Sequence, residues 1–208
     1  DTMKGELTQE QADDLNDADV VIMSRTVNSG DYNAPTSWNT LSVPVIQISP
    51  YLVRSSRWQW INNSSLMTHG GAPLYETAEP SHAIFDGVTL DANNQVAVLD
   101  PAVGIGHTVF IKESQVGAEA KVLATRPDSG WVTIVYWPTG VSFYDETIQN
   151  AGGPRLFFTC GTREGTENGV TAVQGAYNLT ADGAKMLLNA VDFMVSEGPG
   201  LGEETSVD

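Results

Sequence analysis

The residues best suited to binding chemistry are arginines that follow short apolar segments of the chain. Residues 20–23 form a continuous apolar run, and Ser24 and Arg25 follow it directly. A second apolar run at 43–49 leads into a segment that holds two arginines, a tyrosine and two tryptophans. Guanidinium groups bind carboxylates or hydroxyls through paired donors, and an aromatic face can stack on a sugar ring. The predicted ligand-binding residues are Arg25, Ser29, Tyr51, Arg54, Arg57, Trp58 and Arg163. The alternative is that Trp58 belongs to the core and that the arginines pair with the acidic surplus.

Acid–base chemistry has three weaker candidates, Asp31, His69 and Glu164. Asp31 and Glu164 fall in the loops after the first and the last apolar run, so an open parallel sheet would bring both to one rim. His69 precedes a Gly-Gly pair at the end of a short β-like segment. The three histidines of the chain lack the spacing of metal ligands, so neither a metal nor another cofactor is predicted.

Nucleophilic catalysis is not predicted. A catalytic serine or cysteine usually lies on a tight turn between glycines, and neither Ser24 nor Ser49 has that context. Pro50 also lacks the N–H that such a turn donates to an oxyanion hole. Cys160 is the only cysteine, which excludes an internal disulfide. It ends an apolar run at 156–160, and we expect a buried thiol.

The elements that must position these residues follow an α/β pattern. Continuous apolar runs are typical of strands covered on both faces, and Thr8 with Gln11 matches a helix capping box. A final helix follows Thr180, with its apolar stripe at Ala184, Leu187, Leu188, Val191 and Val195. We predict a flavodoxin-like open, mostly parallel sheet with helices on both faces. Residues 1–195 would form one domain with a β-hairpin insertion at about 94–140, and residues 196–208 a flexible acidic tail or linker.

Four segments together carry a resemblance to a known family. They are Ala-Asp-Val-Val-Ile-Met-Ser-Arg at 18–25, Pro-Ser-His-Ala-Ile-Phe-Asp-Gly-Val at 80–88, Arg-Leu-Phe-Phe-Thr-Cys-Gly at 155–161, and the helix at 179–194. The chain resembles the ThuA-like (trehalose-utilisation) branch of the class I glutamine amidotransferase-like fold. The resemblance implies a flavodoxin-like fold and an association with secreted proteins that handle glycans.

The chain departs from that family in two respects. It lacks the cysteine between glycines that serves as the amidotransferase nucleophile. It also has room for only a helix before residues 18–25, where the family opens with a strand and a helix. The gap would be filled by a rearranged sheet, by a later segment of the chain or by another molecule, and we expect internal rearrangement.

The charge of the chain excludes two classes of partner. Ten Lys and Arg residues against 26 Asp and Glu residues give a formal net charge of −16 and a pI near 4.3. A phosphate backbone or an anionic membrane requires a basic footprint, so neither nucleic acid nor membrane is an expected partner. No apolar run approaches the roughly 18 residues of a membrane span. Uniform acidity with few lysines is typical of a salty or extracellular setting, so we expect an extracellular or periplasmic protein.

The expected function is therefore a secreted, carbohydrate-associated domain that binds a sugar or small polar ligand at the strand ends. The residues leave open whether it is catalytic. One alternative is a hydrolase or sugar-converting enzyme that uses the rim carboxylates and a histidine. Another is a structural or assembly module. A chain that begins at Asp1 suggests excision from a precursor, whose other domains would be partners.

Overall fold

The computed structural model describes residues 3–69, 73–100, 102–103, 108–112, 115–145, 147–162, 165–167, 170–172 and 175–198. At 67–69, 108–110, 165–167 and 170–172 it describes the backbone alone. The described helices are α1 (Gln9–Asn16), α2 (Pro35–Asn39), α3 (Pro50–Val53) and α4 (Ala181–Glu197), with 3-10 turns η1 (Ser29–Asp31) and η2 (Ala83–Phe85). The described strands are β1 (Val21–Met23), β2 (Val45–Gln47), β3 (Met67–His69), β4 (Leu74–Glu76), β5 (Gln95–Ala97), β6 (Thr108–Lys112), β7 (Lys121–Thr125), β8 (Trp131–Trp137), β9 (Arg155–Phe158), β10 (Gly165–Glu167) and β11 (Val170–Ala172).

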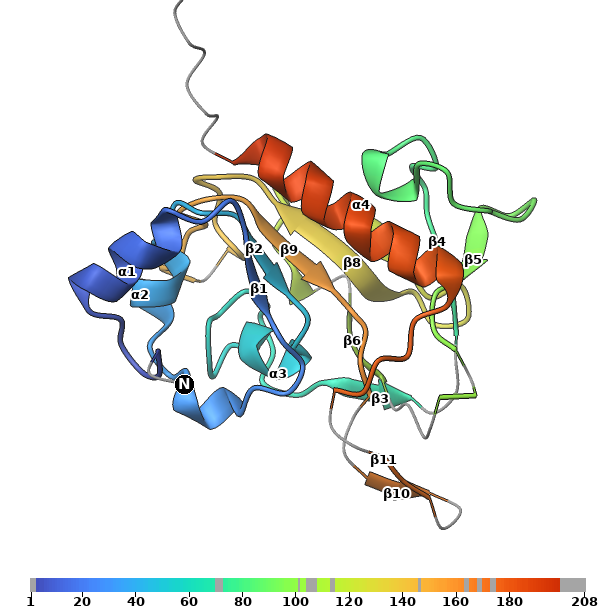
Figure 1. The fold of residues 1–208 in the computed structure, drawn as a ribbon, viewed down its shortest axis with the longest axis horizontal. Helices are drawn as coiled ribbons and strands as arrows, with labels where there is room; N and C mark the ends of the chain where they lie inside the picture. Colours follow the sequence, from blue (N-terminus) through green and yellow to red (C-terminus); the bar gives the residue numbers. More distant parts are fainter. Residues whose placement is uncertain are drawn as a thin grey trace, which may run out of the picture.

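Nine of the described strands form one mixed sheet, and β10 and β11 form a separate hairpin (Figure 1). The main path runs β1-β2-β9-β8-β7-β4-β5, with β6 pairing both β8 and β3. Only the β1–β2 and β2–β9 pairs are parallel among the described pairings, and the others are antiparallel. β1 lies at the edge of the sheet, so the described strands leave no gap at its centre.

The predicted flavodoxin-like, mostly parallel sheet is therefore wrong. The three apolar runs do form parallel neighbours, but the segments between 94 and 140 are not an insertion beside the sheet. They supply β5, β6, β7 and β8, which extend the same sheet in the antiparallel sense. Short turns such as the one between β7 and β8 can join antiparallel strands, whereas parallel strands need long crossovers. The sequence here contains too few helical segments to supply those crossovers.

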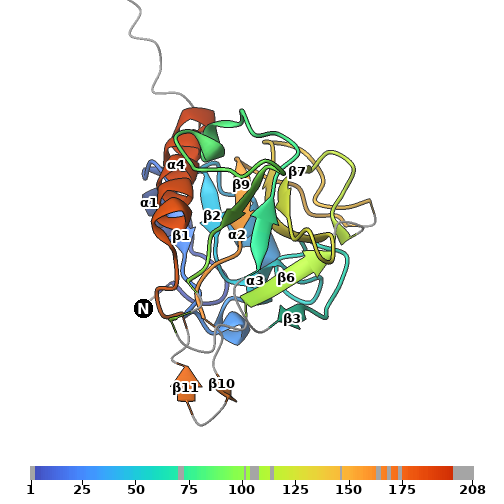
Figure 2. The ribbon, with the colours of Figure 1, turned by 90° about the vertical axis from the view of Figure 1, so that its right-hand side faces the viewer.

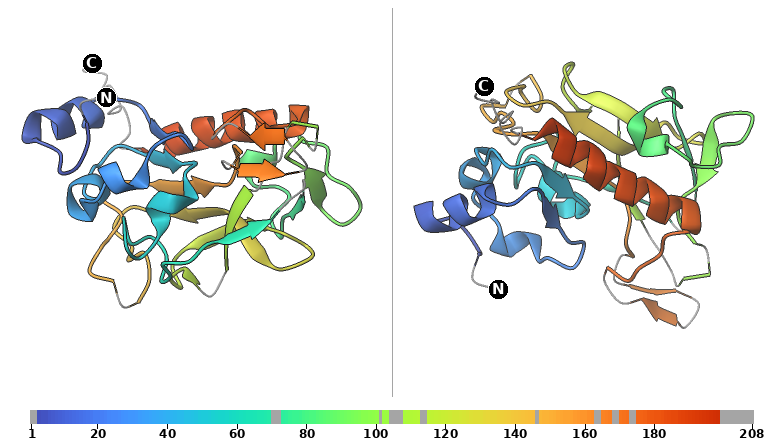
Figure 3. Two further views of the ribbon diagram at one scale, coloured as in Figure 1. Left: turned by 90° about the horizontal axis from the view of Figure 1, so that it is seen from below. Right: turned by 45° about the horizontal axis from the view of Figure 1, so that its top comes forward.

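One long helix and several short ones cover the two faces. α4 lies along one side of the molecule, next to the strands (Figure 2). Its side chains pack with Ile46, Leu156 and Phe158 in one core cluster. α1, α2 and α3 pack in a second cluster around Phe157 and Val135, and α1 and β5 lie at opposite ends of the molecule (Figure 3). None of the described helices has the length and hydropathy needed to cross a lipid bilayer.

Helix starts were easier to predict than helix rotation. The capping box is confirmed. The Thr8 hydroxyl accepts from the Gln11 N–H, and the Gln11 side-chain oxygen accepts from the Thr8 N–H. The predicted stripe on α4 is shifted, because its buried residues are Gly183, Met186, Ala190 and Met194. Of the expected stripe, Leu188 is 67% exposed. A Cβ at Gly183 would lie 2.2 Å from the Val98 carbonyl oxygen, so close approach at this glycine sets the buried side of the helix.

The second core cluster is built from tryptophans that lie far apart in the sequence. Trp38 stacks on Trp58 with ring centroids 5.2 Å apart, and Trp60 meets Trp137 edge-on at 5.5 Å. Trp60 also stacks on Phe143 at 5.3 Å. These rings bury large apolar areas and seal the face of the sheet opposite α4.

Arg155 is fully buried at the amino end of β9, where it pairs with Trp137 of β8. Its Nη1 donates to the carbonyl oxygens of Val43 and Pro154, each at 3.0 Å, and its Nη2 donates to those of Asn39 and Leu41 at 3.0 and 2.5 Å. Burial lowers the pKa of Arg155 to about 9, so the group stays charged at neutral pH. Carbonyl dipoles thus hold a buried cation and tie β9 to the segment before β2.

Candidate functional site

The carboxyl ends of β1, β2 and β9 meet at one edge of the sheet, because these three neighbouring strands are parallel (Figure 1). Open sheets commonly bind ligands at such an edge. The residues that gather there form what we call the arginine rim: Arg25, Ser29, Tyr51, Arg54 and Arg57.

Tyr51 is the centre of the arginine rim. The guanidinium carbon of Arg25 lies 4.7 Å from the centroid of the Tyr51 ring, and that of Arg54 lies 5.4 Å from it. Cations at this distance are attracted by the electrons of the ring face. Arg54 also donates from Nε to the Tyr51 carbonyl oxygen at 2.9 Å and from Nη2 to the Ser29 hydroxyl at 3.2 Å. The loops after β1 and β2 are therefore joined through one arginine.

Arg25 packs against the glycine turn that follows β9. Gly161 has φ +78°, and a Cβ placed there would lie 3.0 Å from the Arg25 Cβ. Only glycine allows both that backbone conformation and that approach without strain. Arg25 is 3% exposed, so packing of the surrounding residues fixes the position of its side chain beside Tyr51.

The electrostatics of the rim favour an anion. Burial, and secondly the charge of Arg57, lower the pKa of Arg54. The ion pairs among the described residues are Lys4–Asp31 and Arg126–Asp128, so neither Arg54 nor Arg57 has a described carboxylate partner. In a chain with a net charge of −16, clustered arginines without such a partner are unusual. An anionic ligand would relieve their mutual repulsion.

The other predicted site residues have different positions. Trp58 is fully buried and donates from Nε1 to the Tyr32 carbonyl oxygen, so it belongs to the core. Asp31 accepts from Lys4 at 3.0 Å in a surface ion pair, which does not suit a general acid or base. The backbone of His69 ends β3, but its side chain lies outside the described part of the structure. Arg163 and Glu164 lie wholly outside the described residues.

Sequence analysis missed three buried polar residues near the same edge, Gln47, Ser49 and Thr133. All three are fully buried. The signal was present for two of them, because Gln47 and Ser49 alternate with isoleucines in the second apolar run. Polar residues at alternate positions of a buried strand point to one face of the sheet.

A small hollow of about 160 Å³ lies beside Arg25, between the strand ends and α4. Its lining includes Ile48, Cys160, Tyr177 and Leu187. Cys160 is 5% exposed, and burial raises its pKa to about 12. The expected burial of this thiol is confirmed, and a thiol held protonated at neutral pH is a poor nucleophile.

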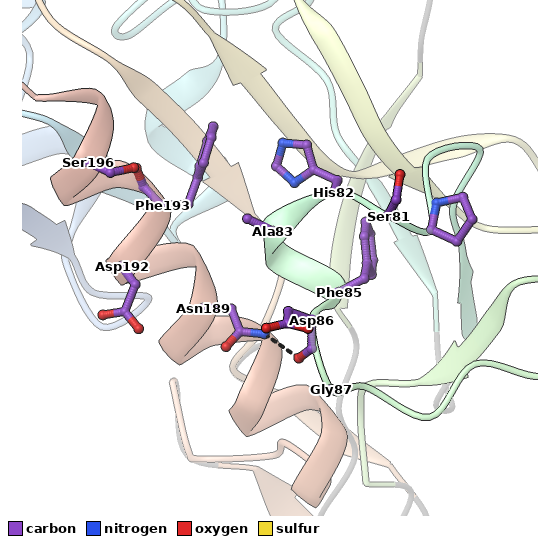
Figure 4. Close-up of a pocket in the computed structure, with 11 residues that line it drawn as sticks. Ser81, His82, Ala83, Phe85, Asp86, Gly87, Asn189, Asp192, Phe193 and Ser196 are labelled. Carbon is purple, nitrogen blue, oxygen red and sulfur yellow. Dashed lines mark hydrogen bonds between the residues drawn. The ribbon is translucent and has the colours of Figure 1, made fainter.

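A larger open groove of about 690 Å³ lies between η2 and α4 (Figure 4). Its polar groups hold the fold together: Asn189 donates to the carbonyl oxygens of Ile84 and Asp86, at 3.1 and 2.9 Å. The His82 ring packs edge-on against Phe193 with centroids 4.8 Å apart. Asn189 and the His82 ring therefore hold η2 against α4.

Metal chemistry has no support in the described part of the chain, where no three His, Cys, Asp or Glu side chains are grouped to hold an ion. The arrangement at the rim can bind and orient an anion. Among the described residues it places no acid–base pair beside the arginines.

Comparisons with known proteins leave the family open. No family model matches the sequence, and no curated protein matches it. Among solved structures, Cytoplasmic Protein STM3548 from Salmonella typhimurium aligns with 90% of this chain and 76% of its own, at 12% identity and a TM-score of 0.49. An identity and a score at this level establish neither a shared fold nor a shared function.

Proposed function

We propose that the protein binds a small anionic ligand at the arginine rim and that binding is its function. The observation that carries the proposal is the pair of guanidinium groups, from Arg25 and Arg54, on the single ring of Tyr51. Arg54 and Arg57 have no carboxylate partner in the described residues. A carboxylate or sulfate group would receive charge-assisted hydrogen bonds from these planar donors.

The resemblance to secreted ThuA-like proteins that handle glycans adds a second, weaker support, for a carboxylated or sulfated sugar as the source of the anion. The acidic composition suits the extracellular or periplasmic setting proposed from the sequence. Of the three acid–base candidates, the described residues include the side chain of Asp31 alone, which forms an ion pair with Lys4.

Isothermal titration calorimetry with sulfate, glucuronate and glucose tests the proposal. We expect the wild-type protein to bind sulfate and glucuronate and to bind them less tightly as NaCl is added. Arg54→Gln should weaken both at least tenfold, because a charge-assisted bond contributes about 1.5–3 kcal/mol. Lys121→Gln is the matched control, since it removes one positive charge from an exposed position next to Tyr136. Binding of neither anion, or equal losses in both variants, would contradict the proposal.

A further inference from the structure

β1 lies at one end of the main sheet path, and its outer edge is unpaired. The Val21 N–H donates to the Pro44 carbonyl oxygen at 2.9 Å, and the Met23 carbonyl oxygen accepts from the Ile48 N–H at 3.0 Å. Both residues therefore turn these backbone groups toward β2, and the N–H and C=O of Ile22 between them point outward. Within the described part of the chain, no residue bonds to these two groups of Ile22. Such an edge is a template for a further strand.

The opposite end of the path has a covered edge. In β5, the Gln95 N–H donates to the Asp91 carboxylate, and the Gln95 carbonyl oxygen accepts from the Asp91 N–H, both at 2.9 Å. The Ala97 carbonyl oxygen accepts from the Thr180 hydroxyl at 2.6 Å. A local turn and the residue that caps α4 thus occupy outward groups of β5. Among the described residues, β1 has no equivalent cover, so β1 is the edge available for pairing.

The face of the sheet beside α4 is apolar at the β1 edge and incompletely covered. Ile22 pairs with Ile46, whose side chain packs in the cluster beneath α4, so the Ile22 side chain lies on the same face. It is nevertheless 46% exposed, and no described helix lies in front of β1 in Figure 1. Leu188 and Val195 of α4 are 67% and 42% exposed.

The exposed residues of α4 lie on the flank of the helix that faces the β1 side. On the other flank, Lys185 and Asn189 donate to backbone carbonyl oxygens of residues 84–87. Leu187, by contrast, lines a hollow together with Ser24 and Ile48, which follow β1 and β2. The apolar stripe predicted from the sequence therefore borders the β1 edge and is only partly buried. Its members are Ala184, Leu187, Leu188, Val191 and Val195.

We propose that the β1 edge is the interface of a two-fold symmetric dimer, in which β1 of a second copy pairs antiparallel with β1 and joins the two sheets. A two-fold axis beside Ile22 makes the pairing self-complementary, because two opposed Ile22 residues can exchange both N–H···O=C bonds. Both α4 helices then lie on one face of the joined sheet, so their apolar flanks border a shared seam. This inference is independent of the proposed anion binding.

The charges around β1 favour a second copy in this orientation. Asp17 and Asp19 are exposed just before β1, and Arg25 follows it. Asp19 lies three residues before Ile22 and Arg25 three residues after it, so the acidic end of each strand meets the arginine end of the other. The net charge of −16 on each copy opposes association, so added NaCl should strengthen the dimer by screening that repulsion.

Sedimentation equilibrium over a range of protein and NaCl concentrations tests the dimer. We expect wild-type protein to dimerise reversibly, with a Kd that falls as NaCl is added. Ile22→Lys should raise the Kd at least tenfold, because it puts a charged side chain at the seam. Ile22→Pro should do the same by removing the outward N–H, since β1 and β2 do not bond through it. Leu74→Lys is the matched control, because Leu74 is 39% exposed on β4 near the other end of the path and should keep the wild-type Kd.

Ile22→Cys tests the register without relying on a loss of association. Opposed Cα atoms in such a pair lie about 5.5 Å apart, which suits a disulfide, and the native Cys160 is buried. Mild oxidation should link Ile22→Cys into covalent dimers and leave Leu74→Cys monomeric. The proposal is overturned if wild-type protein is monomeric at every protein and salt concentration, if Ile22→Lys and Leu74→Lys have the same Kd, or if both cysteine variants cross-link equally. Sulfate titrations are read separately, so failure of the dimer leaves the anion site standing, and the reverse.

Discussion

The two ends of the same parallel strands hold arginines in opposite ways. At the amino end, Arg155 is enclosed and donates to four backbone carbonyl oxygens within 3.0 Å. At the carboxyl end, Arg25 and Arg54 both lie over the ring of Tyr51, and no described carboxylate pairs with Arg54. The partners of the guanidinium donors, rather than the residue type, distinguish the structural Arg155 from the arginines of the proposed binding site.

This difference has a consequence for charge. Carbonyl dipoles stabilise Arg155 without cancelling its charge, and the side chain has no exposed surface. Burial lowers the pKa of Arg54, and the nearby charge of Arg57 lowers it further. Four carbonyl oxygens thus surround the Arg155 guanidinium within the folded chain, whereas Arg54 and Arg57 have no described carboxylate partner.

Arg155→Met should have the largest effect on stability. It tests whether the arginine at the amino ends of the parallel strands stabilises the fold. The change leaves several buried carbonyl oxygens without donors, so we expect the free energy of unfolding to fall by about 3–5 kcal/mol. Urea denaturation measures the loss. Arg54→Gln should lower it by less than about 1 kcal/mol, because Arg54 is only partly buried. A loss below about 1 kcal/mol for Arg155→Met would show that the carbonyl cage does not stabilise the fold.

Gly161→Ala should have an intermediate effect on stability. It tests whether the position of Arg25 at the carboxyl ends of the strands matters for sulfate binding. Gly161 and Gly130 have similar φ angles, +78° and +68°, but a Cβ at Gly130 would meet no atom within 4 Å. Both alanine variants should lose about 1–2 kcal/mol through backbone strain. Only Gly161→Ala should also displace Arg25 and weaken sulfate binding, by about twofold to fivefold. Equal sulfate affinities in the two variants would show that the position of Arg25 does not matter for binding.

His82→Asn should have the smallest effect and separates stability from binding. Burial lowers the pKa of His82 below its usual 6.5. The unfolded chain therefore takes up the proton first, and the stability from neutral His82 is present above about pH 6.5 and lost as the pH falls through the folded-state pKa. Melting temperatures at pH 7.5 and 5.5 should differ less in His82→Asn than in wild type. Asparagine can replace the bond that His82 Nδ1 accepts from the Ile84 N–H.

Sulfate affinity provides the control for that experiment. Arginines stay charged over this pH range, so the affinity should be the same at both pH values in both proteins. An equal pH dependence of the melting temperature in wild type and His82→Asn would contradict a role for this histidine.

The sequence predicted the local elements better than their partners. Continuous apolar runs correctly indicated three neighbouring parallel strands, because burial on both faces leaves a pattern in the residues themselves. The antiparallel strands that complete the sheet were misassigned to an insertion, because a run such as 131–137 does not encode which strand will pair with it. Pairing depends on residues far away in the chain.

The candidate site shows the same limit. The arginines that follow the first two runs were predicted to meet at one edge, and two of them do share Tyr51. Trp58 could not be assigned from its neighbours in sequence, because its place in the core is set by Trp38 and by the Tyr32 carbonyl. The buried atoms of Gln47 and Thr133 could be recognised as unpartnered only once the neighbouring strands were in place.

The position of β9 between β2 and β8 also constrains how the chain can fold. β2 pairs with β9, with Val45 opposite Arg155, so the parallel strands join the rest of the sheet only after β9 is in place. Closing so long a loop is entropically unfavourable and slows folding. During synthesis, β2 and β8 leave the ribosome before the strand that separates them, so both have exposed edges until residues 155–158 arrive. A nascent chain stopped before that point lacks the strand that joins β2 to β8 and is open to pairing with other molecules.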